Sequence, residues 1–444
     1  MTVPGTRRYD ASYYQRDWVL ACHDATSFYS TPLAWDVHGE LDESVLTRAL
    51  QELVGRHDAL RTAFHPHDGD VDQLVWPRVD VQLRTDDLSA APDPAAALES
   101  RLVREAERPR LLVAPPLWHA LLLRLGPRHH VLAVFISHLV FDGWSHGVLH
   151  DELVRCVRAA VAGRPPRLPR LPLRAGDFAH QERILRDAPA ERWWTAQLAG
   201  LPPVTSAPSV GGRFVSTPLP PVPLRHSEAL RDLADMHGVG FNEALLATVI
   251  AARRHEVGDD VVIGVTRASR ERPESHRVIG PLLDHLPVRV DTSGPIRVRD
   301  LLERVHTAYR EAAFRKLPLG LIRRVVSDDL TGRGGRLFDT RYNYMPSASS
   351  GAAVVLTAAG ELRIAPRPVD PLRQRPRHTE DHPEVLPLSL NFHRQMDGQL
   401  TGELCGHDRV FPPDALTAVG EDVVATLEQL VSGSGGQPLP GPLR

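Results

Sequence analysis

Two proline-rich stretches set the strongest limits on how this chain can fold, because closely spaced prolines interrupt helices and central strands. Residues 164–173 read RPPRLPRLPL and predict an extended crossing segment, and a second cluster at 201–224 indicates a lobe boundary. With 444 residues, 42% of them hydrophobic, the chain is long enough for two cores. We therefore expect a mixed α/β (α+β) fold of two lobes, residues 1–178 and residues 179–444. The second lobe includes the crossover segments and a flexible tail from about residue 432.

Hydrophobic spacing predicts the regular elements of each half. Apolar residues at alternate positions indicate half-buried strands, continuous apolar runs indicate buried strands, and apolar residues three or four apart indicate helices. By these patterns we expect strands at 33–37, 130–136, 259–266 and 285–291, and helices at 45–54 (capped by Asp42 or Ser44), 148–161, and 241–257 (capped by Asn242).

Composition and charge exclude several classes of protein. The 52 basic and 55 acidic residues are interspersed and give a net charge of −3, so the chain has no basic stripe for nucleic acid. The apolar runs are shorter than a membrane span, and the N-terminus lacks the apolar core of a signal peptide. Cys22, Cys156 and Cys405 have no paired spacing, so we expect free thiols. We therefore expect a cytoplasmic monomer with no nucleic-acid or membrane partner.

The stretch ISHLVFDGWSHG, residues 136–147, allows two different active sites. Its second half fits the Gly-x-Ser-x-Gly nucleophile elbow of serine hydrolases, with Ser145 as the nucleophile. An elbow serine directly follows its strand, however, whereas the apolar strand here ends nine residues earlier, and no His-Gly-Gly-Gly segment is present. We therefore favour Ser145 as a cap of the following helix and keep the hydrolase as an alternative.

The first half of the same stretch offers a proton acceptor. Histidine is the side chain best suited to accept a proton near neutral pH, and His138 directly follows a buried strand that would hold its ring in place. Asp142 and Gly143 predict a tight turn, and we expect the Asp142 carboxylate to have a buried partner. By itself the pattern also fits a histidine that is merely packed in a core.

His146 and His150 lie four residues apart, the spacing of a zinc-binding pair on a helix. The sequence offers no glutamate in the metalloprotease position between them and no evident third ligand, and they flank an apolar stripe. We therefore expect packed histidines and no bound metal.

Segments in a fixed order resemble the condensation domains of nonribosomal peptide synthetases. RHDALRTAF is similar to the family's Arg-His-Glu-x-Leu-Arg-Thr-x-Phe segment, and ISHLVFDGWS is similar to its His-His-x-x-x-Asp-Gly segment. Five further segments follow the family's order over about residues 10 to 430: YYQRDWVL at 13–20, GDFAHQE at 176–182, RWWTAQLAGLPP at 192–203, DDVVIGVTRASRERPE with VIGPLLDHLPVRV at 259–290, and RLFDTRYNYMP at 336–346.

The resemblance implies two chloramphenicol-acetyltransferase-like lobes arranged as a V, with the active site in a tunnel between them. It also implies acyl transfer from the phosphopantetheine of a peptidyl or acyl carrier protein to an amine or alcohol, either carrier-bound or a free small molecule, with no cofactor held by the chain itself. The site residues it suggests are His138 as the base, Gly143 as a backbone donor to the oxyanion, Asp142 paired with Arg270, Trp144 as a tunnel or core residue, and Asn343 near the site or satisfying local backbone.

Two positions depart from the family pattern. Ser137 replaces the first histidine, and neighbours in an extended strand point in opposite directions, so residues 137 and 138 cannot both face a tunnel. Asp284, assigned to the tunnel, stands where the family has asparagine. We expect a free-standing acyltransferase that forms an amide or ester in natural-product biosynthesis. The alternatives are a catalytically silent module that binds carrier proteins and a serine hydrolase.

Overall fold

The computed structural model describes most of the chain. The described residues are 4–22, 26–27, 30–106, 108–202, 214–327, 330, 336–346, 351–369, 388–433, 436 and 438–439. The expected tail from about residue 432 lies largely outside them.

Two compact units make up the molecule. The first contains residues 1–185, 268–283 and 348–382, and the second contains residues 186–267, 284–347 and 383–444. Two segments of the second half of the sequence therefore return to the first unit. The expected division after residue 178 assigned both segments to the second lobe.

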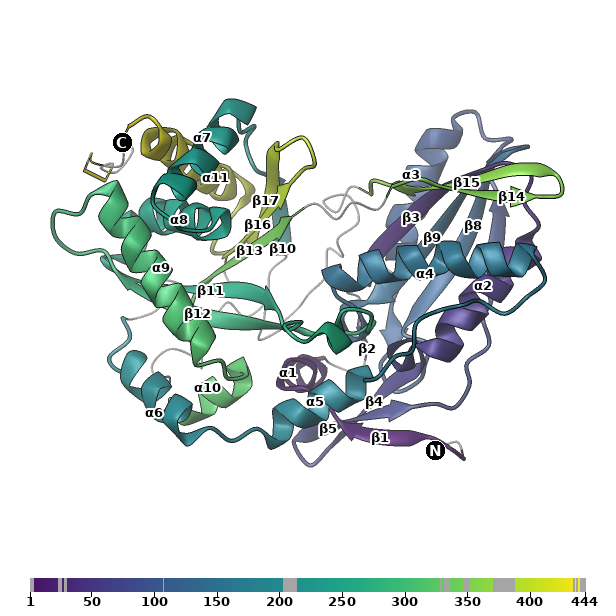
Figure 1. Cartoon of the computed structure of the whole chain (residues 1–444), viewed down its shortest axis with the longest axis horizontal. Coiled ribbons are helices and arrows are strands. Elements are labelled where there is room, and N and C mark those ends of the chain that lie inside the picture. Colours follow the sequence, from purple (N-terminus) through teal and green to yellow (C-terminus); the bar gives the residue numbers. More distant parts are fainter. Residues whose placement is uncertain are drawn as a thin grey trace. The chain divides into compact units, whose positions relative to one another are not determined.

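The first unit is built on a six-stranded sheet with the order β14-β15-β3-β9-β8-β6, drawn with its helices in Figure 1. A three-stranded sheet, β1-β5-β4, and the pair β2-β7 complete its strands in the described residues. The strands are β1 (Arg7–Asp10), β2 (Thr26–Ser27), β3 (Ser30–His38), β4 (Thr62–His67), β5 (Asp70–Val75), β6 (Leu83–Asp87), β7 (Arg110–Leu111), β8 (Trp118–Gly126), β9 (His129–Ser137), β14 (Ala353–Thr357) and β15 (Gly360–Arg367). The helices are α1 (Tyr13–Ala21), α2 (Glu43–Arg56), η2 (Asp58–Arg61), α3 (Pro94–Ala106), η3 (His138–Val140), α4 (Gly143–Val161), α5 (Ala175–Ile184) and η4 (Pro273–Ser275).

Strand β9 is apolar throughout its centre because helices cover both faces of its sheet. Leu132, Val134 and Ile136 belong to the larger core cluster, whereas Val131, Ala133 and Phe135 join the smaller cluster with α3. Alternate residues of a strand point to opposite faces, so a strand that is buried on both sides loses its polar positions. This burial holds the end of β9, where the candidate base follows, in a fixed position.

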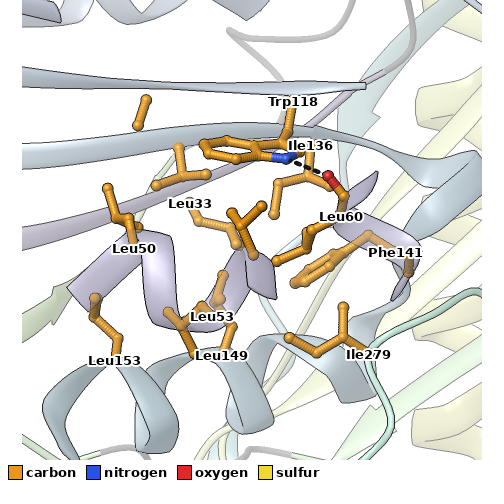
Figure 2. Close-up of a cluster of buried hydrophobic side chains, with 14 of the residues drawn as sticks. Leu33, Leu50, Leu53, Leu60, Trp118, Ile136, Phe141, Leu149, Leu153 and Ile279 are labelled. Carbon is orange, nitrogen blue, oxygen red and sulfur yellow. Dashed lines mark hydrogen bonds between the residues drawn. The ribbon is translucent and has the colours of Figure 1, made fainter. Parts of the chain in front are cut away.

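Helices α2 and α4 pack on one face of this sheet. Figure 2 shows Leu50 and Leu53 of α2 meeting Leu149 and Leu153 of α4 beneath the strands. The indole of Trp118 donates a hydrogen bond to the Leu60 carbonyl (3.0 Å), which satisfies its polar atom inside the core.

The returning segments contribute to this core directly. Strand β15 pairs antiparallel with β3, with Ile364 opposite Val37, and both side chains are buried. Ile279, from the segment at 268–283, packs in the same cluster and is drawn in Figure 2. The first unit therefore needs residues from both halves of the sequence.

The second unit contains a six-stranded sheet with the order β10-β17-β16-β13-β11-β12. Its strands β11, β13 and β16 run parallel, and β16, β17 and β10 are antiparallel. The elements are α6 (Ala188–Gln197), β10 (Phe214–Pro218), α7 (Leu224–Met236), α8 (Phe241–Val257), β11 (Asp260–Ala268), β12 (Leu283–Asp291), α9 (Val298–Phe314), α10 (Leu319–Val325), β13 (Thr340–Pro346), β16 (Leu388–Arg394), β17 (Leu400–His407) and α11 (Pro413–Val431).

The expected mixed α/β class and the expected strands are confirmed, and the helices differ mainly at their starts. Asp42 caps α2 through the Ser44 N–H (2.9 Å), which selects one of the two expected caps. Helix α8 begins at Phe241, so the expectation that Asn242 caps it is wrong. Its cap is Gly240, whose N–H donates to the Glu243 carboxylate (2.9 Å). In the part of the chain that the structure describes, no helix is long and apolar enough to cross a bilayer.

Candidate active site

His138 lies at the exit of strand β9, as the first residue of the short helix η3. The strand before it is buried along its second half, and the next residues, Leu139 and Val140, are also buried. The imidazole itself is partly exposed. A titratable ring is therefore presented at the surface of the first unit from a rigid backbone.

Helix α1 holds this ring in place. Tyr14 Oη lies 3.2 Å from His138 Nδ1, within hydrogen-bonding distance. The Trp18 ring lies parallel to the imidazole, with 6.3 Å between centroids and 6° between planes. One helical turn thus fixes both the direction and the plane of the imidazole.

The backbone around His138 is tied to the same helix. The amide of Gln15 donates to the Leu139 carbonyl (2.9 Å), and its own oxygen accepts from the Ser12 N–H (3.0 Å) in a capping box. Helix α1 is fixed in turn by the Tyr13 N–H, which donates to the Glu182 carboxylate (2.7 Å).

Asp142 and Arg270 form the ion pair expected from the sequence. One guanidinium nitrogen of Arg270 lies 3.0 and 2.9 Å from the two carboxylate oxygens, and both side chains are buried. The carboxylate also caps α4 through the Ser145 N–H (2.8 Å) and accepts from the Leu282 N–H (3.0 Å). Arg270 further donates to the carbonyls of Ser275 (2.7 Å) and Val278 (2.8 Å). Protein groups therefore replace water around both charges, as a buried pair requires.

Ser145 belongs to this structural network. Its hydroxyl donates to Asp142 Oδ1 (2.7 Å), accepts from the Gly280 N–H (3.1 Å), and has no exposed surface. Helix α4 begins at Gly143 with Asp142 as its cap, so Ser145 lies inside the first turn and the expectation that it caps the helix is wrong. A nucleophile must be reached by its substrate, and the buried hydroxyl of Ser145 does not meet that condition.

Gly143 and Trp144 occupy the start of α4. Gly143 is exposed, and as the first helical residue its N–H has no intrahelical partner to donate to. Trp144 is 45% exposed and donates from its indole to the His276 carbonyl (2.9 Å), with its ring 5.8 Å from the Arg270 guanidinium. Trp144 therefore lies against one partner of the buried ion pair, and its assignment to the tunnel stays a prediction.

Ser137, which stands in place of the first histidine, is 1% exposed. Its hydroxyl caps η3 by accepting from the Leu139 N–H (3.4 Å), and its backbone N–H donates to the Leu117 carbonyl (2.8 Å). Its contacts are structural and lie next to the candidate base.

His146 and His150 pack against Trp35, as expected of core histidines. His150 Nδ1 accepts from the Trp35 indole (2.8 Å), so its Nε2 carries the proton donated to the Gly351 carbonyl (3.2 Å). Burial lowers the pKa of both imidazoles. Among the residues that the structure describes, no third metal ligand lies close enough to complete a site with this pair.

The remaining two sequence-predicted residues lie in the second unit. Asp284 accepts hydrogen bonds from the N–H groups of His285 (2.8 Å) and Leu319 (3.0 Å), the latter at the start of α10. Burial raises the pKa of its carboxyl to about 6. Asn343 on β13 donates to Asn391 Oδ1 (3.2 Å) on β16. The tunnel to which both were assigned stays a prediction.

The sequence did not single out Tyr14, Trp18 or Gln15 as site residues. The Ser12-x-x-Gln15 capping box does mark the start of a helix. Tyr14 and His138 are 124 residues apart in the sequence, so no local pattern indicates that they are in contact. Only the packing of α1 against the end of β9 reveals that these residues act together.

Comparison with known proteins gives one consistent result. The family model of the condensation domain matches residues 6–368. A linear gramicidin synthase polypeptide of Brevibacillus parabrevis is 33% identical over 332 residues, which cover 68% of this chain and 4% of the synthase polypeptide. Cyclosporin synthetase of Tolypocladium inflatum is 32% identical over 325 residues, which cover 70% of this chain and 2% of the synthetase. The chain therefore spans a small fraction of the synthases that it matches.

Solved structures share the fold over almost the whole chain. The X-domain from teicoplanin biosynthesis has a TM-score of 0.81 and 23% identity, covering 99% of this chain and 98% of its own. The same X-domain in complex with OxyB gives a TM-score of 0.79 with the same identity, covering 99% and 96%. A double mutant of the starter condensation domain of rhizomide synthetase RzmA, in complex with C8-CoA and Leu-SNAC, has a TM-score of 0.76 and 20% identity, covering 97% of this chain and 96% of its own.

Proposed function

The chain belongs to the condensation-domain family, and from this premise we propose that it is an acyltransferase in nonribosomal peptide biosynthesis. It would join an acyl group, carried as a thioester on a carrier protein, to an amine or alcohol. The observation that carries this proposal is the histidine at the end of β9, held by α1 and presented at the surface of the first unit.

The reaction needs one base and one donor to an oxyanion. The attacking amine or alcohol forms a bond to the thioester carbonyl carbon and gives its proton to His138. The tetrahedral intermediate then collapses with cleavage of the carbon–sulfur bond, and the phosphopantetheine thiolate leaves and takes up the proton. No covalent acyl-enzyme is required, so no serine nucleophile is needed.

Tyr14 would orient this base and select its tautomer. A neutral imidazole accepts a proton at Nε2 only when Nδ1 carries the other proton, and Nδ1 then donates to Tyr14 Oη. When His138 becomes an imidazolium, the same hydrogen bond becomes charge-assisted and stronger. Tyr14 is therefore a positioning residue for the tautomer that the reaction requires.

The N–H of Gly143 is our candidate donor to the oxyanion. It is exposed, lies at the N-terminus of a 19-residue helix, and has no backbone acceptor within that helix. The partial positive charge at a helix N-terminus favours a developing negative charge. The Asp142–Arg270 pair would hold this helix start in place without contacting substrate.

A comparison of variants tests the proposal. Acyl-loaded carrier protein and a panel of amine and alcohol acceptors, both free and carrier-bound, are supplied to the wild type and to His138→Ala, with product detected by mass spectrometry. We expect product with the wild type and its loss in the variant. Equal turnover by both proteins would exclude His138 as the base.

A silent module that binds partner proteins is the second candidate. Two observations favour it: Ser137 replaces a histidine of the family motif, and the X-domain, with the same fold, has been captured in complex with OxyB. Retained carrier-protein binding without turnover for any donor and acceptor pair would support this candidate. The expectations of a cytoplasmic and monomeric protein stay predictions.

A further inference from the structure

A second cluster of side chains that could bind a metal lies on strands β3 and β9. It is at the end of β9 opposite to the end that His138 follows. It comprises Asp36, His38 and His129, whose potential ligand atoms all lie within 4.8 Å of one another. From this cluster we propose a binding site for a divalent transition-metal ion of the zinc class. The inference goes beyond the proposed acyl transfer and does not depend on it.

Sheet register brings the three side chains together. Asp36 and His38 are two residues apart on β3, so they project from the same face. His129 lies directly opposite His38 on β9. The two imidazole rings stack at 4.2 Å between centroids and 20° between planes. A cross-strand histidine pair with a carboxylate two residues along can therefore converge on one ion.

The donor set selects the kind of ion. Two imidazole nitrogens and one carboxylate oxygen are borderline ligands that suit zinc and its neighbours better than calcium or magnesium, which prefer oxygen alone. Ligand atoms around a tetrahedral zinc, at about 2.0–2.2 Å from the ion, lie roughly 3–3.5 Å apart. His129 Nε2 and Asp36 Oδ1 are already 2.9 Å apart, so small side-chain rotations suffice.

The surrounding groups set the conditions for binding. Without metal, the Nε2 proton of His129 is shared with Asp36, so an ion that binds at this nitrogen must displace that proton. Arg367 on β15 holds the same carboxylate, 3.0 and 3.3 Å from its two oxygens, and Arg363 lies opposite His38 in the β15 register. Binding should therefore weaken in acid and improve when the Arg367 charge is removed.

The site would bridge neighbouring strands of the sheet. Asp36 and His38 belong to β3, His129 belongs to β9, and the competing arginine belongs to the returning strand β15. An ion held only by the folded state stabilises that state by mass action. Bound metal would therefore raise the melting temperature of the chain.

Metal titration of the full chain tests the inference. The protein is stripped with a chelator, exchanged into buffer, and titrated with zinc chloride by calorimetry, while cobalt(II) reports tetrahedral coordination through its visible absorption. We expect one tight site per chain. We further expect at least a tenfold weaker affinity in His129→Ala and His38→Ala, and a severalfold tighter affinity in Arg367→Gln.

His130→Ala is the matched control, because His130 neighbours His129 but lies opposite Val37, on the other face of the sheet. It should leave the affinity unchanged. The exposed residue His38 provides a variant that retains the fold if His129→Ala does not. No stoichiometric zinc binding by the wild type, or an affinity that is the same in His38→Ala and the wild type, would overturn the proposal.

Discussion

The carboxylate of Asp142 caps helix α4 and also binds the guanidinium of Arg270, which lies 128 residues away in the sequence. The first contact fixes the helix that carries Gly143. The second ties the same helix to the segment at 268–283, which returns to the first unit from the second half of the chain. One buried carboxylate therefore joins the local geometry of the candidate site to the topology of the unit.

Removal of one charge from this pair should be strongly destabilising. We expect Arg270→Ala to lower the free energy of unfolding by about 3–5 kcal/mol, because Asp142 is left as an uncompensated buried charge. Arg78→Ala is the matched control: Arg78 pairs with Asp80 at the surface, where both side chains are at least 70% exposed, and its loss should cost about 0–1 kcal/mol. Denaturant unfolding measures both values, and equal losses would show that the buried pair has no special role.

Tyr14→Phe should lower the rate of turnover. The variant removes the hydroxyl that lies 3.2 Å from His138 Nδ1, so the imidazole loses a hydrogen bond that helps to fix its orientation. We expect about a tenfold loss of kcat. Tyr13→Phe, on the same helix, should leave kcat unchanged. Equal kcat in Tyr14→Phe and the wild type would show that Tyr14 does not position the base.

Ser145→Ala should affect stability and leave the chemical mechanism intact. The Ser145 hydroxyl bridges Asp142 and Gly280 in a site with no exposure, so its removal should cost about 1–3 kcal/mol of unfolding free energy. The folded variant should still turn over substrate, and a serine-reactive fluorophosphonate should not label the wild type. Stoichiometric labelling at Ser145 would instead support the hydrolase.

The raised pKa of Asp284 predicts that this residue contributes to stability in a pH-dependent way. Burial raises the pKa of its carboxyl in the folded state to about 6, above the unfolded value of about 3.9. The folded state therefore binds this proton more tightly, and the resulting stability is present below about pH 4 and lost as the pH rises through 6. Relative to the wild type, Asp284→Asn should gain unfolding free energy between pH 4 and pH 7. A difference that is independent of pH would contradict the assignment.

Much of the fold could be predicted from local pattern. The apolar runs at 130–136 and 259–266 are strands β9 and β11, and the helical stripe before residue 161 is α4. The return of residues 268–283 and 348–382 to the first unit could not be predicted in this way, because hydrophobic periodicity reports which face of an element is buried but not which neighbour buries it.

The candidate site could also be predicted only in part. His138, Asp142 and Arg270 could be assigned because their segments resemble a family motif. Tyr14 could not, since its contact with His138 depends on how α1 packs. Likewise, the spacing of His146 and His150 is typical of a zinc pair, but in the structure both histidines pack against Trp35. Asp36, His38 and His129 come together through the register of strands β3 and β9, which the sequence pattern does not reveal.

The most direct test of His138 as the base is the rate of product formation by wild type and His138→Ala with one acyl-loaded carrier protein and one accepted nucleophile. We predict at least about a hundredfold loss in the variant, consistent with removal of a general base. The variant should remain folded and keep its affinity for the carrier protein. Unchanged turnover in a folded His138→Ala protein would contradict the claim that this histidine performs the chemistry.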